Sequence, residues 1–235
     1  VLTLDAHHTL ALEEAANAVR GDLPGFALDV HVASEWSGND IALQSARRDI
    51  ARADIVLAHM LFLEDHYRPV IDALRERADH CAAMAGCLSA PQIVALTRLG
   101  RFRPGGQAGG PLAFLKKLRG RSDGSGAGER QMAMLRRLPR ILRFVPGKAQ
   151  DLRAYLLTLG YLLAGSAQNM EGMIRHLAGR YAGALTGEAP LPREYPETAM
   201  YHPQAPGRIV ERLEDLPRTE QPKGRVGLLL MRSYV

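Results

Sequence analysis

The sequence predicts an α/β protein with a flavodoxin-like or doubly wound parallel sheet, followed by a helical extension. In the first hundred residues, short apolar runs alternate with amphipathic helical patterns, which is typical of βαβ units. After Gly100 the strand-like runs stop and basic helical segments take their place. Of the 235 residues, 46% are hydrophobic and 23% are charged, as in globular proteins with a buried core.

The first hundred residues contain four predicted strands and four predicted helices. The strands are Val1–Leu4, Phe26–Ala33, Asp54–Met60 and Cys81–Ala85. The helices are His8–Arg20, Asp40–Ala53, Glu64–Ala78 and Ala90–Gly100. Asp40 is the expected N-cap of its helix, because its carboxylate can accept a hydrogen bond from a free backbone N–H. Gly21 and Gly100 follow predicted helix ends, where a left-handed residue is favoured.

The second half predicts helices separated by loops. A loop over Phe102–Gly110, a short helix over Leu112–Leu118 and a Gly/Ser-rich linker over Arg121–Glu129 come first. Longer helices are predicted over Arg130–Val145, which Pro139 should kink or divide, and over Asp151–Ala164. A third helix carries Met170, Ile174, Leu177 and Tyr181 on one face, and Ser166 is its expected cap.

These changes predict four parts along the chain. A parallel α/β domain spans residues 1–100, and a basic helical region spans 101–187. A Pro-rich connector spans 188–225, and residues 226–235 hold a further strand at Val226–Met231. That strand has no helix after it, and Val1 begins directly in a strand, so we expect the sequence to be a fragment of a longer protein.

Positive charge is concentrated in the middle of the chain. Residues 98–148 hold 13 Lys and Arg side chains against Asp123 and Glu129, whereas the whole chain has a net charge of only +5. Arg136, Arg137 and Arg140 are therefore candidates for binding an anion or a partner protein. A nucleic-acid-binding module is the alternative of another class, but few aromatic residues lie nearby for base stacking, so no nucleic acid is expected. Another possibility is that these residues form a solvent-exposed basic surface with no binding function.

His7 and His8 directly follow the first predicted strand. In open α/β sheets, ligands bind outside the carboxyl ends of the strands. The two imidazoles are therefore candidates for contacting a carboxylate or a metal ion. The alternative is a helix start with two half-exposed histidines that bind nothing.

The sequence predicts no ATP site, metal site or catalytic residue in this chain. Gly105–Gly110 has no strand directly before it, and Pro146–Ala149 lacks the remaining residues of a Walker motif. Cys81 and Cys87 have the wrong spacing for a zinc knuckle or a redox pair, so they are predicted to be small buried residues, although their role stays open. No arrangement typical of a Ser or Cys nucleophile stands out.

A cytoplasmic location is expected. The longest mostly apolar stretch, Tyr155–Gly165, has eleven residues, whereas a membrane span needs roughly 20. The sequence does not start with a secretory signal. Two cysteines in the whole chain suit a reducing compartment.

Four stretches resemble the magnesium chelatase H-subunit family, and the resemblance covers nearly the whole chain. Lys148–Arg153 with Tyr155, followed by Gly165, Ser166 and Asn169, resembles one block of the family. Tyr201–Pro206 resembles its His-Pro-x-Ala-Pro element. Val226–Ser233 resembles the strand that opens the next, larger domain, which is shared with the cobaltochelatase large subunit. A fourth element of the family is a helix that begins after a small residue and a Pro and ends in Leu-Gly. The stretch from Ser89–Val94 to Leu99–Gly100 resembles it.

The resemblance implies a protein that binds protoporphyrin IX and inserts Mg²⁺, giving Mg-protoporphyrin IX for (bacterio)chlorophyll synthesis. ATP would be hydrolysed on partner subunits, the I and D components. The family's catalytic residues lie in the later domain, beyond Val235, so none is assigned here and no cofactor is expected on this chain alone. The candidates for porphyrin or partner contact stay His7, His8, Arg136, Arg137 and Arg140. A cobaltochelatase large subunit is the related alternative.

Overall fold

The computed structural model describes residues 1–4, 6–36, 38–104, 138–183, 188–196, 198–205 and 208–217. The elements predicted at Leu112–Leu118, Arg121–Glu129 and Val226–Met231 lie outside these residues, as does the first part of Arg130–Val145. Packing divides the chain into two compact units, Val1–Pro192 and Arg193–Val235. The domain boundaries at residues 100, 187 and 225 stay predictions, because close packing does not decide which segments fold alone.

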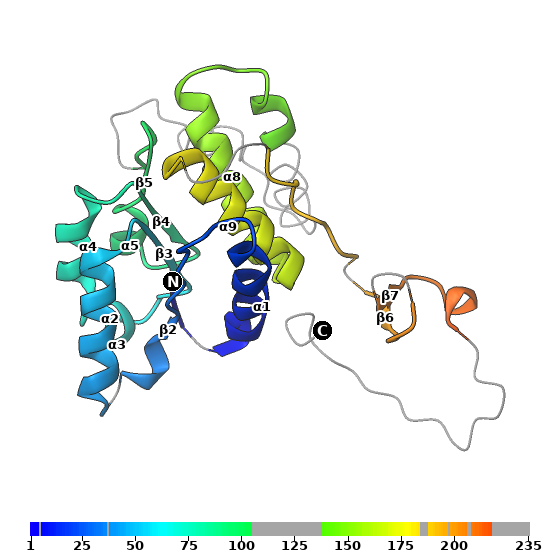
Figure 1. Ribbon diagram of the computed structural model, residues 1–235, viewed down its shortest axis with the longest axis horizontal. Helices are drawn as coiled ribbons and strands as arrows, with labels where there is room; N and C mark the ends of the chain where they lie inside the picture. Colours follow the sequence, from blue (N-terminus) through cyan, green and yellow to red (C-terminus); the bar gives the residue numbers. More distant parts are fainter. Residues whose placement is uncertain are drawn as a thin grey trace, which may run out of the picture. The chain divides into compact units, whose positions relative to one another are not determined.

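A five-stranded sheet with the order β2-β1-β3-β4-β5 forms the centre of the first unit (Figure 1). Its strands are β1 (Leu2–Thr3), β2 (His31–Val32), β3 (Ile55–His59), β4 (Ala83–Cys87) and β5 (Arg98–Leu99). The first four are parallel, and β5 runs antiparallel to β4. The chain order reverses at β1, as in flavodoxin-like sheets. The predicted α/β fold is confirmed, with an antiparallel edge strand in addition.

Helices cover both faces of the sheet (Figure 1). Leu57 of β3 packs in one core with α1 (Thr9–Arg20), α8 (Lys148–Ala164) and α9 (Ala167–Tyr181). Val56 and Ala58 of the same strand pack in a second core with α2 (Asp40–Arg52) and α4 (Ile71–Ala78). The alternation follows from the two-residue period of a strand, which directs successive side chains to opposite faces. The helical segments of the second half therefore share a core with the sheet.

Three predicted helix ends are wrong in detail. Asn39 is the N-cap of α2 in place of Asp40, because the Asn39 side-chain oxygen accepts a hydrogen bond from the Ala42 N–H at 3.1 Å. Gly21, at the end of α1, has a φ of −62°, which is ordinary right-handed backbone. Gly100 is left-handed with a φ of 54°, but it follows a strand and not a helix.

Two other predicted helices are interrupted. The pattern over Glu64–Ala78 forms α3 (Glu64–Tyr67) and then α4, with Pro69 between them, because proline lacks the N–H that a continuous helix needs. The pattern over Ala90–Gly100 stays helical only in α5 (Pro91–Val94) and then becomes β5. Gly86 of β4 allows α5 to lie on the sheet, since a Cβ there would stand 2.4 Å from a backbone oxygen of α5.

The pair α8–α9 is joined by a short turn in which the predicted cap, Ser166, is confirmed. Gly165 ends α8 in the left-handed conformation, and Ser166 caps α9 by accepting a hydrogen bond from the Asn169 N–H at 3.3 Å. Arg175 of α9 forms an ion pair of 2.6 Å with Asp22, just after α1. Residues 138–142 are also helical, and Pro139 is the second of these five residues.

The second unit contains a small antiparallel hairpin, β6 (Met200–Tyr201) and β7 (Ile209–Val210), and the short helix η4 (Leu213–Asp215). His202 lies in the turn of this hairpin, where its Nδ1 accepts a hydrogen bond from the Gln204 N–H at 3.2 Å. Among all described residues, no helix is both long and apolar enough to cross a membrane.

Candidate functional site

The predicted histidine site lies where the strand order reverses. His7 and His8 form the short helix η1 (Ala6–His8) after β1, with His7 exposed and His8 half-buried. The His8 ring meets the ring of His59 edge-on, with centroids 5.1 Å apart. His59 ends β3, beside β1, and is only 2% exposed. The structure therefore pairs His8 with a histidine that sequence reasoning missed, although His59 lies within the predicted strand Asp54–Met60.

The loops at this edge of the sheet contain unusual backbone conformations. Met60 follows β3 with a φ of 60°, and Leu88 follows β4 with a φ of 47°, and a left-handed non-glycine residue costs about 1 kcal/mol or more. Ser89 fixes both loops, because its hydroxyl donates to the Cys87 carbonyl and accepts from the Leu61 N–H. The described residues hold no group of three or more His, Cys, Asp and Glu that could bind a metal ion.

A cavity of about 630 Å³ lies at the opposite, amino ends of the strands. Its apolar lining includes Phe26 and Ile55 together with Leu177 of α9. At its polar end, Asp49 accepts a hydrogen bond from His31 at 2.9 Å and pairs with Arg52 at 2.7 Å. The lining also includes two further carboxylates, Asp29 and Asp54. Three carboxylates against one arginine disfavour the propionate groups of a porphyrin here.

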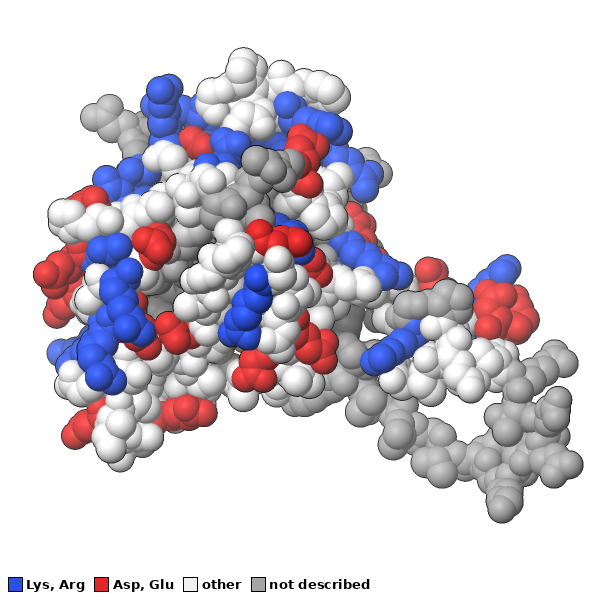
Figure 2. All heavy atoms as spheres, viewed as in Figure 1, with Lys and Arg blue, Asp and Glu red and all other residues white. Residues whose placement is uncertain are grey.

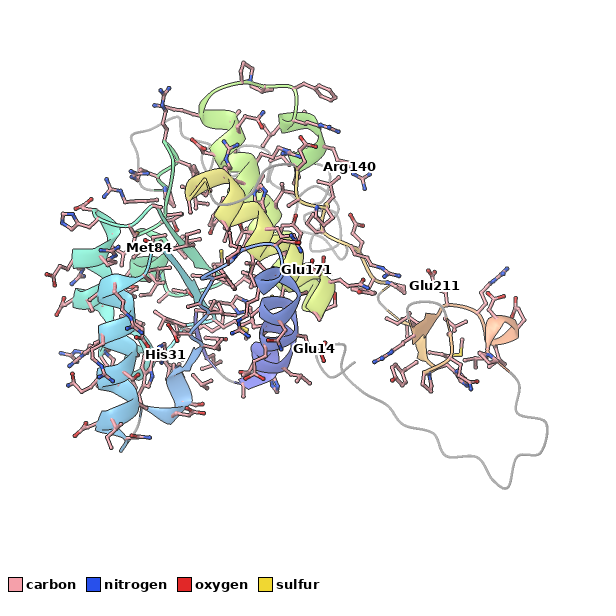
Figure 3. All side chains as sticks on the ribbon, viewed as in Figure 1. Glu14, His31, Met84, Arg140, Glu171 and Glu211 are labelled. Atoms are coloured by element: carbon pink, nitrogen blue, oxygen red, sulfur yellow. The ribbon has the colours of Figure 1, made fainter. Side chains whose placement is uncertain are left out.

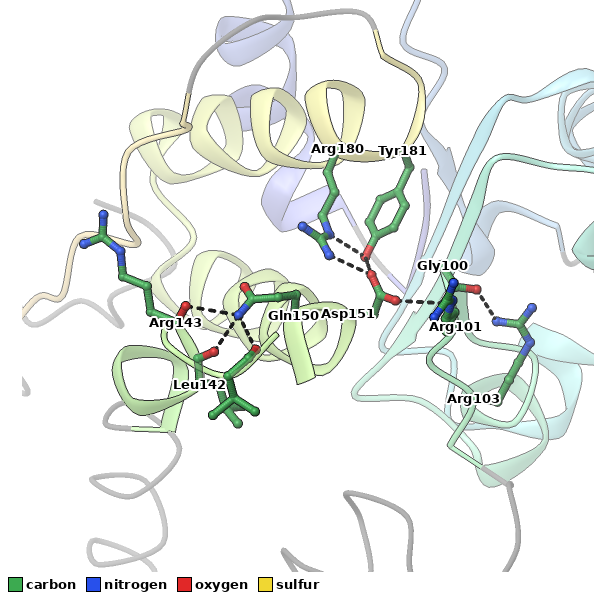
Figure 4. A network of polar contacts seen from close by, with 10 residues as sticks. Gly100, Arg101, Arg103, Leu142, Arg143, Gln150, Asp151, Arg180 and Tyr181 are labelled. Carbon is green, nitrogen blue, oxygen red and sulfur yellow. Dashed lines mark hydrogen bonds and ion pairs between the residues drawn. The ribbon is translucent and has the colours of Figure 1, made fainter. Parts of the chain in front are cut away.

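The Lys148–Arg153 block forms a polar junction at the start of α8 (Figure 4). Asp151 is buried and accepts hydrogen bonds from the Arg101 N–H at 2.8 Å and from Arg180 at 2.8 Å. Tyr181 also donates to it at 3.4 Å. Gly100 passes so close that a Cβ there would be 2.6 Å from the carboxylate. We name this set, Gly100, Arg101, Asp151, Arg180 and Tyr181, the Asp151 junction.

The surroundings of this junction favour the charged form of Arg180 and the neutral form of Tyr181. Burial lowers the pKa of Arg180, but its hydrogen bonds and charge interactions with Asp151 and Tyr181 outweigh burial and raise that pKa overall. Burial raises the pKa of Tyr181 well above its usual value. His176, one turn earlier on α9, has a pKa lowered to about 4 by burial and by the nearby charges of Arg180 and Arg153. The junction therefore holds α8, α9 and the end of the sheet together.

The neighbouring Gln150 points to another part of the chain. Its Nε2 lies 2.7 Å from the Leu142 carbonyl, 3.1 Å from the Arg143 carbonyl and 2.6 Å from the Val145 carbonyl (Figure 4). These carbonyls end the helix at residues 138–142, where backbone oxygens have no partner inside the helix. One amide group thus closes the turn between this helix and α8.

The predicted basic site is only partly described. Arg136 and Arg137 lie outside the described residues, and Arg140 is an exposed residue of the helix at 138–142, pointing away from the core (Figure 3). Both cysteines are free. Cys87 is buried at the end of β4, and burial raises the pKa of its thiol far above the usual value, which fits the predicted structural role. Cys81 is half-buried just before that strand.

Comparison with known proteins decides the family. A domain of unknown function (DUF3479) matches residues 1–156, and the CobN/Magnesium Chelatase family matches residues 159–235. The magnesium-chelatase H protein of Cereibacter sphaeroides is 45% identical over the whole chain. The chain belongs to the magnesium-chelatase H-subunit family. The family resemblance expected from the sequence motifs is therefore confirmed.

Other relatives of this family agree. The Rhodobacter capsulatus protein of the same name is 41% identical over the whole chain, and the chloroplastic protein of Oryza sativa subsp. indica is 28% identical over 80% of it. The chain spans 20% of the length of each bacterial relative and 15% of the rice protein. The two family matches meet near residues 156–159, inside the continuous helix α8, so this boundary does not coincide with a break in the fold.

Proposed function

We propose that this chain is the N-terminal part of a magnesium-chelatase H protein that binds protoporphyrin IX and inserts Mg²⁺ to give Mg-protoporphyrin IX. The product would enter (bacterio)chlorophyll synthesis. The observation that carries this proposal is 45% identity over the whole chain with a protein of that name. Mg²⁺ and protoporphyrin IX would be substrates of the full protein, and this chain alone would bind no cofactor.

Metal insertion and ATP hydrolysis would be carried out by different subunits of a cytoplasmic complex. Metal insertion requires removal of two pyrrole protons and partial dehydration of Mg²⁺, which holds its water tightly. We assign those steps to residues outside this chain, in the rest of the polypeptide. ATP would be hydrolysed by the partner I and D subunits. The absence of a Walker pattern from this sequence supports that division.

The candidate residues receive different roles in this proposal. His7 and His8 lie at the sheet edge where flavodoxin-like folds bind ligands, which supports a contact with porphyrin or with another part of the polypeptide. Arg136, Arg137 and Arg140 belong to the basic segment and are better suited to a partner protein. The acidic end of the large cavity argues against porphyrin in that place.

Metal insertion by the full-length protein tests the proposal. The protein is mixed with purified I and D subunits, ATP, Mg²⁺ and protoporphyrin IX, and the fluorescence of Mg-protoporphyrin IX is followed. We expect product only when all components are present. Titration of this chain alone with porphyrin, followed through Trp36, its only tryptophan, then shows whether it contributes to binding. Absence of product with every component present would overturn the proposed function.

A cobaltochelatase large subunit is the second candidate, because the family that matches residues 159–235 includes CobN. The same assay separates the two. A magnesium chelatase should not accept Co²⁺ in place of Mg²⁺ at a comparable rate, whereas the alternative predicts cobalt insertion and little magnesium insertion.

A further inference from the structure

The turn before α8 exposes three apolar side chains in a row of five residues. Phe144 is 84% exposed, Ile141 is 63% exposed and Val145 is 44% exposed. We call residues 141–147 the apolar turn. In Figure 1 it is the light-green loop beyond the start of α8. Single exposed apolar residues are common on proteins, but an aromatic and two branched side chains together are typical of a contact surface.

The apolar turn has a fixed shape. The two N–H groups of the Gln150 amide are shared among three of its carbonyls, and the Val145 N–H donates to the Leu142 carbonyl at 3.1 Å. Arg153 of α8 donates to the Pro139 carbonyl at 3.0 Å, which fastens the preceding helix. Leu138 is buried and Leu142 packs against the same core. The inner side of this segment is therefore anchored while its apolar side chains face outward.

The surroundings of the apolar turn are positively charged. Residues 138–150 contain Arg140, Arg143 and Lys148 and no carboxylate. All three basic side chains are exposed. Figure 2 shows uncharged residues at the top of the view, with Lys and Arg on both sides and acidic residues just below them. Arg143 forms an ion pair of 3.3 Å with Glu188, so the rim also carries one carboxylate, and Arg140 and Lys148 supply most of its positive charge.

We propose that the apolar turn is a docking surface for a partner protein whose apolar pocket is rimmed by acidic side chains. The inference rests on the proposed function, because it takes this partner to be one of the ATP-hydrolysing subunits of the chelatase. Phe144 would enter the pocket, while Arg140 and Lys148 would face the acidic rim. Buried aromatic side chains and arginine are the residues that contribute most to protein interfaces.

The shape of the turn favours a protein over the other possible partners. A small molecule such as a porphyrin binds in a concave site, whereas this surface projects outward. A membrane surface is fluid and does not require a fixed loop conformation. A protein pocket benefits from a rigid loop, because fewer conformations are lost on binding. The hydrogen bonds from Gln150 that fix the turn therefore favour a protein partner, whose pocket has a defined shape.

The test measures how much partner the full-length protein needs. Magnesium insertion is assayed with increasing concentrations of the I and D subunits for the wild type, Phe144→Ala and Arg140→Glu. We expect Phe144→Ala to raise the half-saturating concentration on the order of tenfold, as for an aromatic interface anchor. Arg140→Glu should raise it several-fold and reduce its dependence on salt. Porphyrin affinity and the rate at saturation should stay unchanged.

Ile41→Ala is the matched control, because Ile41 is an apolar residue 83% exposed on α2, far from the turn in sequence. It should leave the half-saturating concentration unchanged. If the wild type is active and Phe144→Ala has the same half-saturating concentration of I and D subunits, the docking proposal is overturned and the proposed function is left intact. Failure of the wild type itself would count against the proposed function. A different outcome is that the wild type sediments with vesicles containing anionic lipid while Phe144→Ala does not. That result would overturn the docking proposal, because the apolar turn would then bind a membrane.

Discussion

Two neighbouring residues of α8 support two very different regions of the molecule. Asp151 faces inward and joins α9 and the end of the sheet through hydrogen bonds that satisfy its buried carboxylate. Gln150 faces the apolar turn, where its two amide N–H groups are shared among three carbonyls and Phe144 is exposed. The Asp151 junction therefore serves stability, and the apolar turn has the properties of a binding surface. Changes in the two regions should separate folding from assembly.

The largest effect on folding is expected from Asp151→Ala. It leaves the Arg180 guanidinium and the Arg101 N–H without their acceptor, so the free energy of unfolding should fall by about 2–3 kcal/mol. Urea unfolding of this chain measures the change. Asp72→Ala is the control, since Asp72 is an exposed residue in an ion pair with Arg75, and it should cost less than about 0.5 kcal/mol. Equal losses in the two variants would contradict a structural role for the junction.

The next effect is a pH dependence from His176, between the charges of Arg180 and Arg153. Its pKa of about 4 in the folded protein lies below the ordinary 6.5, so the unfolded chain binds a proton more readily. Stability should therefore fall as the pH decreases from about 6.5 to about 4, by about 2 kcal/mol between pH 7 and pH 5. His176→Gln should lose this part of the dependence. If the stability of His176→Gln depends on pH as strongly as that of the wild type, protonation of His176 is not the cause of the pH dependence.

Sequence reasoning captured the elements that depend on local pattern. The helices α1, α2 and α9 have clear amphipathic faces, and Ser166 caps α9 as predicted. It failed where distant contacts decide the structure. The pattern at Ala90–Gly100 is helical, but pairing with β4 turns its end into β5. His8 and His59 meet only because β1 and β3 are neighbours in the sheet, although 51 residues separate them in sequence.

The motif at Lys148–Arg153 illustrates the same limit. Its residues can be matched to a family from the sequence, but their roles depend on partners that lie far away in the chain. Asp151 binds the backbone of Arg101 and the side chain of Arg180, 50 and 29 residues away. No periodic pattern links such positions. The motif therefore indicated the family before it explained what the residues do.

A smaller loss of stability is expected for Gln150→Glu. Glutamate has nearly the same shape but cannot donate hydrogen bonds to the carbonyls of the turn when it is ionised. Because the Arg143 and Val145 carbonyls lie at the surface and can bind water instead, the cost should be about 1 kcal/mol. Urea unfolding measures this cost, and proteolysis near Phe144 reports the loosened turn. A loss as large as that of Asp151→Ala would show that Gln150 is part of the core.

The smallest effect on folding is expected for Phe144→Ala. The side chain is already exposed, so its removal should change the free energy of unfolding by less than about 0.5 kcal/mol. Thermal unfolding of this variant beside Ile41→Ala checks the expectation. A marked loss for Phe144→Ala alone would mean that its ring packs against the protein and is not available to a partner.

Amide hydrogen exchange on the full-length protein, with and without the I and D subunits, tests the contrast between the two regions most directly. Amides of residues 141–148 should gain protection when the subunits bind. Those of the Asp151 junction, including Arg101, should stay as protected as they are in the free protein. Protection that appears at the sheet edge around Met60 and Leu88, with none in the apolar turn, would contradict this account.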